Sequence, residues 1–161
     1  MRGVLHAGAK PPEFFPAGNE GYAVVSPRAL KLIQDFGVDQ LDILPLNWTN
    51  DSDRCFEGYA FLDVLRLIDA YDYKRCEVVF RKVDGRMLGH LGDKRWFRES
   101  EIDPSIHLFH DFYDRKQLVM SRALWRFLHL HEVRGLYAVD PANNECVLHH
   151  EKLARLTGGK K

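Results

Sequence analysis

The spacing of apolar positions changes from that of a strand to that of a helix in the stretch that begins at residue 22. Residues 22–26, YAVVS, form a short apolar run that predicts a strand. Apolar residues between Leu30 and Phe36 then recur at helical spacing, behind Ser26, a residue type preferred at helix N-caps. Residues 41–46, LDILPL, predict a second strand. One short stretch therefore predicts the order strand, Ser, helix, strand.

The same order is repeated later in the chain. Aligned without a gap, Ser26 falls on Ser121 and Leu41 falls on Leu136. Ser121 is again a predicted N-cap, and residues 135–139, GLYAV, predict the returning strand. An internal duplication and convergence on a common unit both explain the likeness. Either way, we expect both units to feed one sheet.

Three further elements are predicted between and beside the two units. Residues 57–69 alternate in a way that favours one long strand, mostly buried on both faces. Asp84-Gly85 lies between two strand-like runs and predicts a hairpin. Asp103-Pro104 precedes residues 105–112, SIHLFHDF, which predict a short helix.

These elements predict an α+β fold in a single domain that spans residues 1–161. The fold would contain a mixed sheet with two strand–Ser–helix–strand units and a central hairpin. Residues 1–21 are rich in Pro and Gly and predict an irregular lead-in, and residues 142–161 predict a polar tail.

Composition places the chain among ordinary globular proteins. It has 161 residues and is 45% hydrophobic, with 23 Lys plus Arg against 23 Asp plus Glu. A net charge of zero argues against bulk binding of nucleic acid. Three cysteines without a CxxC spacing favour reduced thiols in a cytosol. The sequence has neither a signal peptide nor an 18-residue apolar run, so we expect a cytoplasmic protein without a membrane partner.

Signatures of catalysis are sparse. The sequence contains no GxGxxG, GxxxxGKS or GxSxG, so we expect no cofactor and no enzymatic activity. His107, His110 and Asp111 share helical spacing, which leaves a small metal-dependent enzyme as an alternative. No metal site is otherwise predicted. Asp63, inside the predicted long strand, is interpreted as an edge or network residue rather than as a catalytic one.

Charge is unevenly distributed along this neutral chain. Residues 35–77 hold ten acids and four bases, which gives −6. An acidic segment around an aromatic residue suits capture of a basic protein, because complementary fields speed encounter. The predicted protein-binding surface consists of Asp39, Asp42, Trp48, Asp51, Asp53 and Glu57.

A basic segment follows the acidic one and supplies the alternative binding surface. That surface consists of Arg81, Lys82, Arg86, Lys94, Arg95 and Trp96. Bases beside aromatic rings also suit a nucleic-acid-associated module, which is a third hypothesis. Ser26 and Ser121 are expected to be structural caps in every case.

The order of five segments resembles a family of bacterial immunity proteins. The segments are VVSPRALKLI, FGVDQLDILPL, GYAFLDVLRLIDAYDYKRC, IDPSIHLFHDF and LVMSRALWRFLHLHEVRGLYAV. They resemble the eleventh numbered immunity family of polymorphic toxin systems, first catalogued as a domain of unknown function, over about residues 20–140. The matching positions are Ser26, Tyr59, Asp69, Asp72, Ser121 and Gly135. The chain departs from the pattern at Asp63, where Asn is frequent, and at Cys76, where Ser is frequent.

The resemblance implies a binding protein without catalysis. Such proteins bind and neutralise a cognate toxin domain, often the C-terminal domain of a larger toxin, in the cytoplasm of the producing cell. A nuclease is one such toxin. The resemblance leaves the identity of the toxin, its secretion route and the oligomeric state of this chain open.

Overall fold

The computed structural model describes residues 11–17, 21–46, 56–92, 94–112, 114–137, 139–140 and 145–146. These residues form mixed α and β structure, as the sequence predicts. They divide into two compact units: unit 1 lies within residues 1–68 and 103–136, and unit 2 within residues 69–102 and 137–161. The assignment of both units to one domain stays a prediction.

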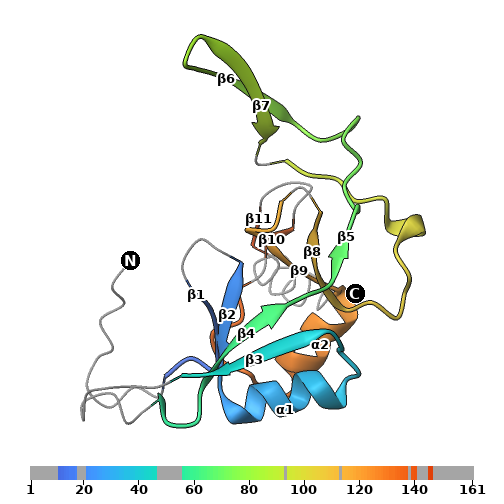
Figure 1. Ribbon diagram of the computed structural model, residues 1–161. Coiled ribbons are helices and arrows are strands. Elements are labelled where there is room, and N and C mark those ends of the chain that lie inside the picture. The colour runs from blue at the N-terminus through green and yellow to red at the C-terminus, as the bar shows by residue number, and fades with distance from the viewer. Residues whose placement is uncertain are drawn as a thin grey trace, which may run out of the picture. The chain divides into compact units, whose positions relative to one another are not determined.

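Figure 1 labels the α-helices and strands of both units. The elements of unit 1 are β1 (Phe14–Ala17), β2 (Tyr22–Val25), α1 (Pro27–Asp35), β3 (Leu41–Pro45), β4 (Ala60–Val64), β5 (Leu67–Ile68), β8 (Leu108–Asp111), β9 (Leu118–Met120) and α2 (Arg122–Leu130). Those of unit 2 are β6 (Val78–Val83), β7 (Arg86–Leu91), a 3-10 turn η2 (Glu99–Glu101), β10 (Val139–Asp140) and β11 (Glu145–Cys146).

A four-stranded antiparallel sheet in the order β1-β2-β4-β3 carries the core of unit 1. Both helices lie against one face of this sheet (Figure 1). Alternation along each strand sends one set of apolar side chains toward the helices. The core consists of Phe14, Ala23, Val25, Ala29, Ile33, Leu62, Val64, Leu108, Leu124, Leu128 and Val133.

The predicted irregular lead-in over residues 1–21 is wrong for its last part, because residues 14–17 form β1. This strand pairs with β2 in the register Phe14↔Val25 to Ala17↔Tyr22. Pro16 discourages a strand prediction, since it has no N–H to donate. Here β1 is an edge strand, the place in a sheet where Pro is tolerated.

The predicted long strand over residues 57–69 is also wrong, because the chain changes sheets after Val64. The N–H of Leu65 still bonds the carbonyl of Gln40 at 2.8 Å. The carbonyl of Arg66 then accepts from the N–H of His110 at 2.9 Å, and β5 runs parallel to β8. A second, mixed sheet follows in the order β5-β8-β9. Both partners are distant in sequence, so periodicity alone does not reveal the break.

The two strand–Ser–helix stretches therefore enter different sheets, and the prediction that they feed one sheet is wrong. β2 and β3 belong to the four-stranded sheet, whereas β9 belongs to the three-stranded one. The predicted return strand over 135–139 is wrong for residues 135–137, which form no strand. Val139 lies in the short strand β10.

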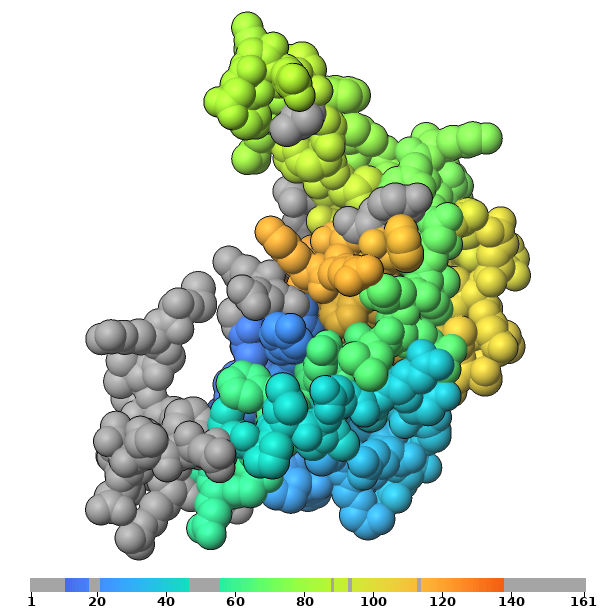
Figure 2. Space-filling view, in the orientation of Figure 1, coloured from blue at the N-terminus to red at the C-terminus, as the bar shows by residue number. Residues whose placement is uncertain are grey.

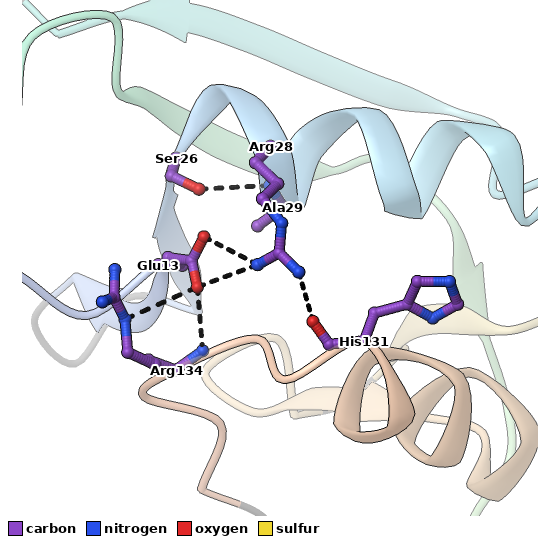
Figure 3. Close-up of polar contacts among 6 residues, drawn as sticks. All are labelled: Glu13, Ser26, Arg28, Ala29, His131 and Arg134. Atoms are coloured by element: carbon purple, nitrogen blue, oxygen red, sulfur yellow. Dashed lines mark hydrogen bonds and ion pairs between the residues drawn. The ribbon is translucent and has the colours of Figure 1, made fainter.

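A buried carboxylate fastens the start of the sheet to the first turn of α1 and to the segment that follows α2 (Figure 3). Glu13, which is 7% exposed, contacts Arg28 of α1 at 3.0 Å and the Nε of Arg134 at 3.6 Å. The backbone N–H of Arg134 also donates to Glu13 at 3.2 Å, and Arg28 donates to the carbonyl of His131. We call Glu13, Arg28 and Arg134 the Glu13 latch.

Opposing influences set the pKa of Glu13. Burial raises this pKa, but hydrogen bonds from Arg28 and Arg134 and their positive charges lower it by more, so it lies below its ordinary value. The latch therefore favours the ionised carboxylate in the folded protein.

Unit 2 is built on aromatic contacts and a hairpin. The ring of Tyr71, which is 1% exposed, stacks on Phe97 with 4.8 Å between centroids. The side chain of Cys76 bridges to the backbone of Trp96, accepting from its N–H at 3.3 Å. β6 and β7 then pair antiparallel around Asp84-Gly85, at the predicted place.

Candidate functional site

β3 and β4 carry two aspartates on the face of the sheet that is turned away from the helices. Asp42 and Asp63 are direct cross-strand partners in the antiparallel register. Their neighbours Leu62 and Val64 point into the core, so alternation sends Asp63 to the opposite face. Figure 2 shows this part of the surface, where residues 41–46 in cyan adjoin β4 in green.

Neither of these two carboxylates has a neutralising partner among the described residues. No hydrogen bond or ion pair joins Asp42 or Asp63 to another described side chain, although Asp42 is exposed and Asp63 is partly buried. Like charges placed directly opposite each other in a sheet destabilise it. The sheet thus holds a repulsive pair that an incoming cation would relieve.

Two further acids of the predicted surface are also exposed. Asp39 makes a two-pronged contact with Arg66, whose Nη2 lies 2.8 and 2.9 Å from the carboxylate oxygens. Its charge is partly compensated, so it contributes less to the local field than Asp42. Glu57 is exposed in the turn before β4. We call Asp39, Asp42, Glu57 and Asp63 the acidic face.

The remaining members of the predicted acidic surface are Trp48, Asp51 and Asp53, and they lie outside the described residues. The chain between β3 and β4 contains all three. Their connection to the acidic face therefore rests on sequence proximity to Asp42 and Glu57. That these three residues belong to the protein-binding surface stays a prediction.

The alternative basic surface separates into two groups. Arg81, Lys82 and Arg86 are exposed on β6 and β7, and Lys94 is exposed beyond them. None of these four side chains forms an ion pair with another described residue. They remain available to an acidic partner.

The other two members of the basic surface serve the structure of unit 2. Arg95 donates from Nε to the carbonyl of Gly92 at 3.0 Å and lies over the Tyr71 ring. The guanidinium of Arg75 covers the Trp96 ring at 4.3 Å. Neither Arg95 nor Trp96 is presented as a free recognition group, which weakens the nucleic-acid hypothesis.

The histidine cluster is not assembled in the way that the metal alternative requires. The predicted helix over 105–112 is wrong, because its second half forms strand β8. An i, i+3 spacing puts His107 and His110 on one side of a helix but on opposite faces of a strand. Asp103 caps a turn instead, and hydrogen bonds from Ser105 lower its pKa.

Each histidine is engaged locally. His107 Nδ1 lies 3.0 Å from Ser121 Oγ, and His110 Nδ1 lies 2.8 Å from the carbonyl of Gln117. His110 and Asp111 are buried in β8. Within the part of the chain that the structure describes, no group of three or more His, Cys, Asp or Glu side chains is placed to hold a metal ion.

The two serines occupy the N-cap positions of the helices. Ser26 Oγ accepts from the N–H of Ala29 at 3.1 Å, and Ser121 Oγ accepts from the N–H of Leu124 at 3.1 Å. Each therefore satisfies one of the backbone donors that a helix start leaves unpaired. Neither belongs to the acidic face.

Sequence reasoning missed Asp63 as a surface acid. Its alternation with Leu62 and Val64 carried a signal, because a polar residue between two buried ones faces the other way. The prediction of a strand buried on both faces hid that signal. The pairing with Asp42 depends on strand register, which the sequence does not state.

Comparison with protein-family models identifies the family of the chain. The model of a family described as the immunity protein family Imm11 matches residues 4–141. No curated protein matches the chain. Among the described residues, no helix has the length and apolar character needed to cross a membrane.

Proposed function

The chain belongs to the Imm11 immunity protein family, and we propose that it binds and neutralises a cognate bacterial toxin domain in the cytoplasm of the producing cell. Immunity proteins are generally not enzymes, and we assign this chain no catalysis of its own. Toxin binding would then depend on a surface whose charge and shape fit the toxin.

We place the toxin-binding surface on the acidic face, together with Trp48, Asp51 and Asp53 of the predicted loop. One observation carries this placement: Asp42 and Asp63 oppose each other in the sheet without a neutralising partner among the described residues. A cationic side chain from a partner would relieve this repulsion and also speed encounter. The pair thus lowers stability in isolation and favours a basic partner.

A nuclease is the toxin class that fits this chemistry best. Enzymes that act on nucleic acids hold phosphates with Lys and Arg side chains, so their substrate clefts are basic. An acidic face can occupy such a cleft in place of phosphates. Inhibition by occupation of the active site follows as part of the proposal.

The test combines binding kinetics with stability for the full-length chain. The probe is the purified toxin domain encoded beside the gene of this protein. Asp42→Asn with Asp63→Asn removes both charges at nearly constant side-chain volume. We expect slower association with a weaker salt dependence, together with unfolding that costs up to about 1 kcal/mol more because the repulsion is gone.

This pair of opposite effects distinguishes a binding role from a structural one. Asp35→Asn is the matched control, because Asp35 is an exposed acid on α1 that is paired with Lys31 at 2.9 Å. It should leave the association rate unchanged. An unchanged association rate and salt slope in the double variant would remove the acidic face from the proposal.

A further inference from the structure

The hairpin of unit 2 has a tight and well-defined geometry. β6 and β7 pair over six positions, from Val78↔Leu91 to Val83↔Arg86. Asp84 and Gly85 both have positive φ, at 49° and 78°. Positive φ at both central residues defines the turn whose twist matches that of the flanking strands. Its register, and therefore the two faces of the hairpin, are fixed.

One face of this hairpin is apolar and exposed. Val78, Phe80 and Met87 point to the same side in this register, and they are 43%, 64% and 62% exposed. We call these three residues the apolar hairpin face. Single exposed apolar side chains are common, but three on one face of a two-stranded ribbon form a contiguous patch.

Gly89 leaves room for two side chains of this patch. A Cβ at residue 89 would lie 3.1 Å from Phe80 Cε1 and 3.3 Å from Val78 Cγ1. The aromatic ring and the valine therefore rest over the bare backbone of the opposite strand, in the manner of an aromatic side chain that covers a sheet glycine. Phe80 and Val78 thus have a neighbour within the ribbon before any partner arrives, which lowers the entropic cost of binding.

Charge on the hairpin specifies the partner. Arg81 and Arg86 lie on the opposite face, and Lys82 lies beside Met87. The ribbon from Val78 to Leu91 thus carries three cations against one acid, Asp84 at the turn. None of the three cations pairs with another described side chain.

We propose that the hairpin is a second docking surface, and that it binds an apolar patch rimmed by acidic side chains on the toxin domain. This inference rests on the proposed function and adds a contact of opposite charge to the acidic face. A protein is favoured over nucleic acid because the exposed valine and methionine gain from apolar burial rather than from base stacking. The zero net charge of the chain also gives no long-range attraction for a polyanion.

The test measures toxin binding by hairpin variants of the full-length chain. Phe80→Ser with Met87→Ser should raise the dissociation rate at least tenfold and leave the association rate within twofold, because apolar contacts form after encounter. Arg81→Glu with Arg86→Glu should instead slow association several-fold. Leu130→Ser, which changes an apolar residue that is 76% exposed on α2, is the matched control and should change neither rate.

Two measurements separate loss of contact from loss of folding. Amide hydrogen exchange over residues 78–91 reports whether the ribbon still forms in each variant. Phe80→Leu keeps an apolar side chain and should bind within about threefold of the original chain. Faster dissociation only in variants whose ribbon has lost its protection would overturn the proposal.

The remaining outcomes decide between partners. If the original chain binds the toxin and all hairpin variants bind equally well, the second surface is wrong and the proposed function stands. If the original chain does not bind the toxin, the proposed function fails first. If the substitutions change only self-association in light scattering, or only the binding of a single-stranded DNA 20-mer, the assigned partner is wrong.

Discussion

The two strand–Ser–helix stretches follow the same backbone path through and beyond their helices. Gly37 and Glu132 occupy equivalent positions after the helices, with φ of 94° and 55°. Gln40 and Gly135 are equivalent three residues later, with φ of 54° and 90°. Each stretch thus has two left-handed residues at matched positions, but Gly occupies the first position in one stretch and the second in the other.

Hydrogen bonds at the helix ends match as well. The N–H of Gly37 bonds the carbonyl of Gln34 at 2.9 Å, and the N–H of Glu132 bonds that of His129 at 3.0 Å. The following N–H in each stretch bonds back to the carbonyl five residues earlier. Both helices therefore end in the same way, by a Schellman-type arrangement.

The two stretches diverge at Leu41 and Leu136, the residues that follow the second left-handed position. Leu41 begins β3 and pairs with Val64, whereas Leu136 begins no strand. The carbonyl of Arg134 is already occupied by the N–H groups of Glu13 and Phe14. Local sequence sets the cap, the helix and its end, but the neighbouring backbone decides whether a strand follows.

The largest expected difference between the two stretches lies at their glycines. A Cβ at Gly135 would lie 2.4 Å from the carbonyl oxygen of Phe14 and 2.6 Å from Pro12, whereas a Cβ at Gly37 would meet nothing within 4 Å. Gly37→Ala should cost about 1–2 kcal/mol from left-handed strain alone. Gly135→Ala should cost about 3 kcal/mol or more, because backbone must also move.

Chemical denaturation of both variants measures the two free energies of unfolding. Equal losses would mean that the contact between Gly135 and β1 does not set the second stretch apart. If only Gly135→Ala loses stability, the loss comes from steric exclusion and not from left-handed backbone strain, which both variants share.

The next effect concerns the Glu13 latch, which contacts both stretches. Glu13→Gln removes the charge that Arg28 and Arg134 share, while the amide retains part of the hydrogen bonding. Both arginines are about half exposed, so solvent screens the interaction, and we expect a loss of about 1–2 kcal/mol near neutral pH.

At acid pH, the difference in stability between the original chain and Glu13→Gln should disappear. Because the pKa of Glu13 is lowered in the folded protein, its contribution is complete above the unfolded pKa and disappears as the pH falls through the folded pKa. The original chain should therefore lose stability more steeply than Glu13→Gln below about pH 5. Asp103, whose pKa is also lowered, supplies a slope that both proteins share. Parallel curves of stability against pH would rule out the latch as the source.

The smallest expected effects concern the capping serines. Ser26→Ala should cost about 1 kcal/mol, a typical value for loss of an N-cap. Ser121→Ala should cost somewhat more, because Ser121 also bonds His107, and this contact has no counterpart at Ser26. As the control, His107→Ala is introduced into the original chain and into each serine variant. It should lower the free energy of unfolding by less when residue 121 is already Ala. Additive losses at His107 and Ser121 would mean that their contact contributes nothing.

The sequence predicts those parts of the fold that depend on neighbouring residues. The Ser caps, both helices and the turn at Asp84-Gly85 have local causes: a hydroxyl acceptor, helical spacing and tolerance of positive φ. The second left-handed position of the first stretch is not visible in this way, because Gln40 occupies it.

The missed features all depend on distant partners. Phe14 enters a strand beside β2, the N–H of Glu13 bonds the carbonyl of Arg134, and residues 108–111 become a strand between β5 and β9. The acidic face shows the same limit, since Asp42 and Glu57 were predicted as surface acids but Asp63 needed the register of β3 against β4. The distribution of charge along the sequence indicates the sign of the charge on a surface. Strand pairing decides which charged residues lie together on that surface.

The placement of α2 near the end of unit 1 has a consequence for synthesis on the ribosome. The four strands of the first sheet are complete at Val64, but Leu124, Leu128 and Val133 still have to cover their inner face. Translation proceeds at about 5–20 residues per second, so the part of this face that α2 covers stays exposed for several seconds after α1 and the sheet have been made. During that interval the nascent chain is a substrate for chaperones and proteases, and only the arrival of the second stretch ends its exposure.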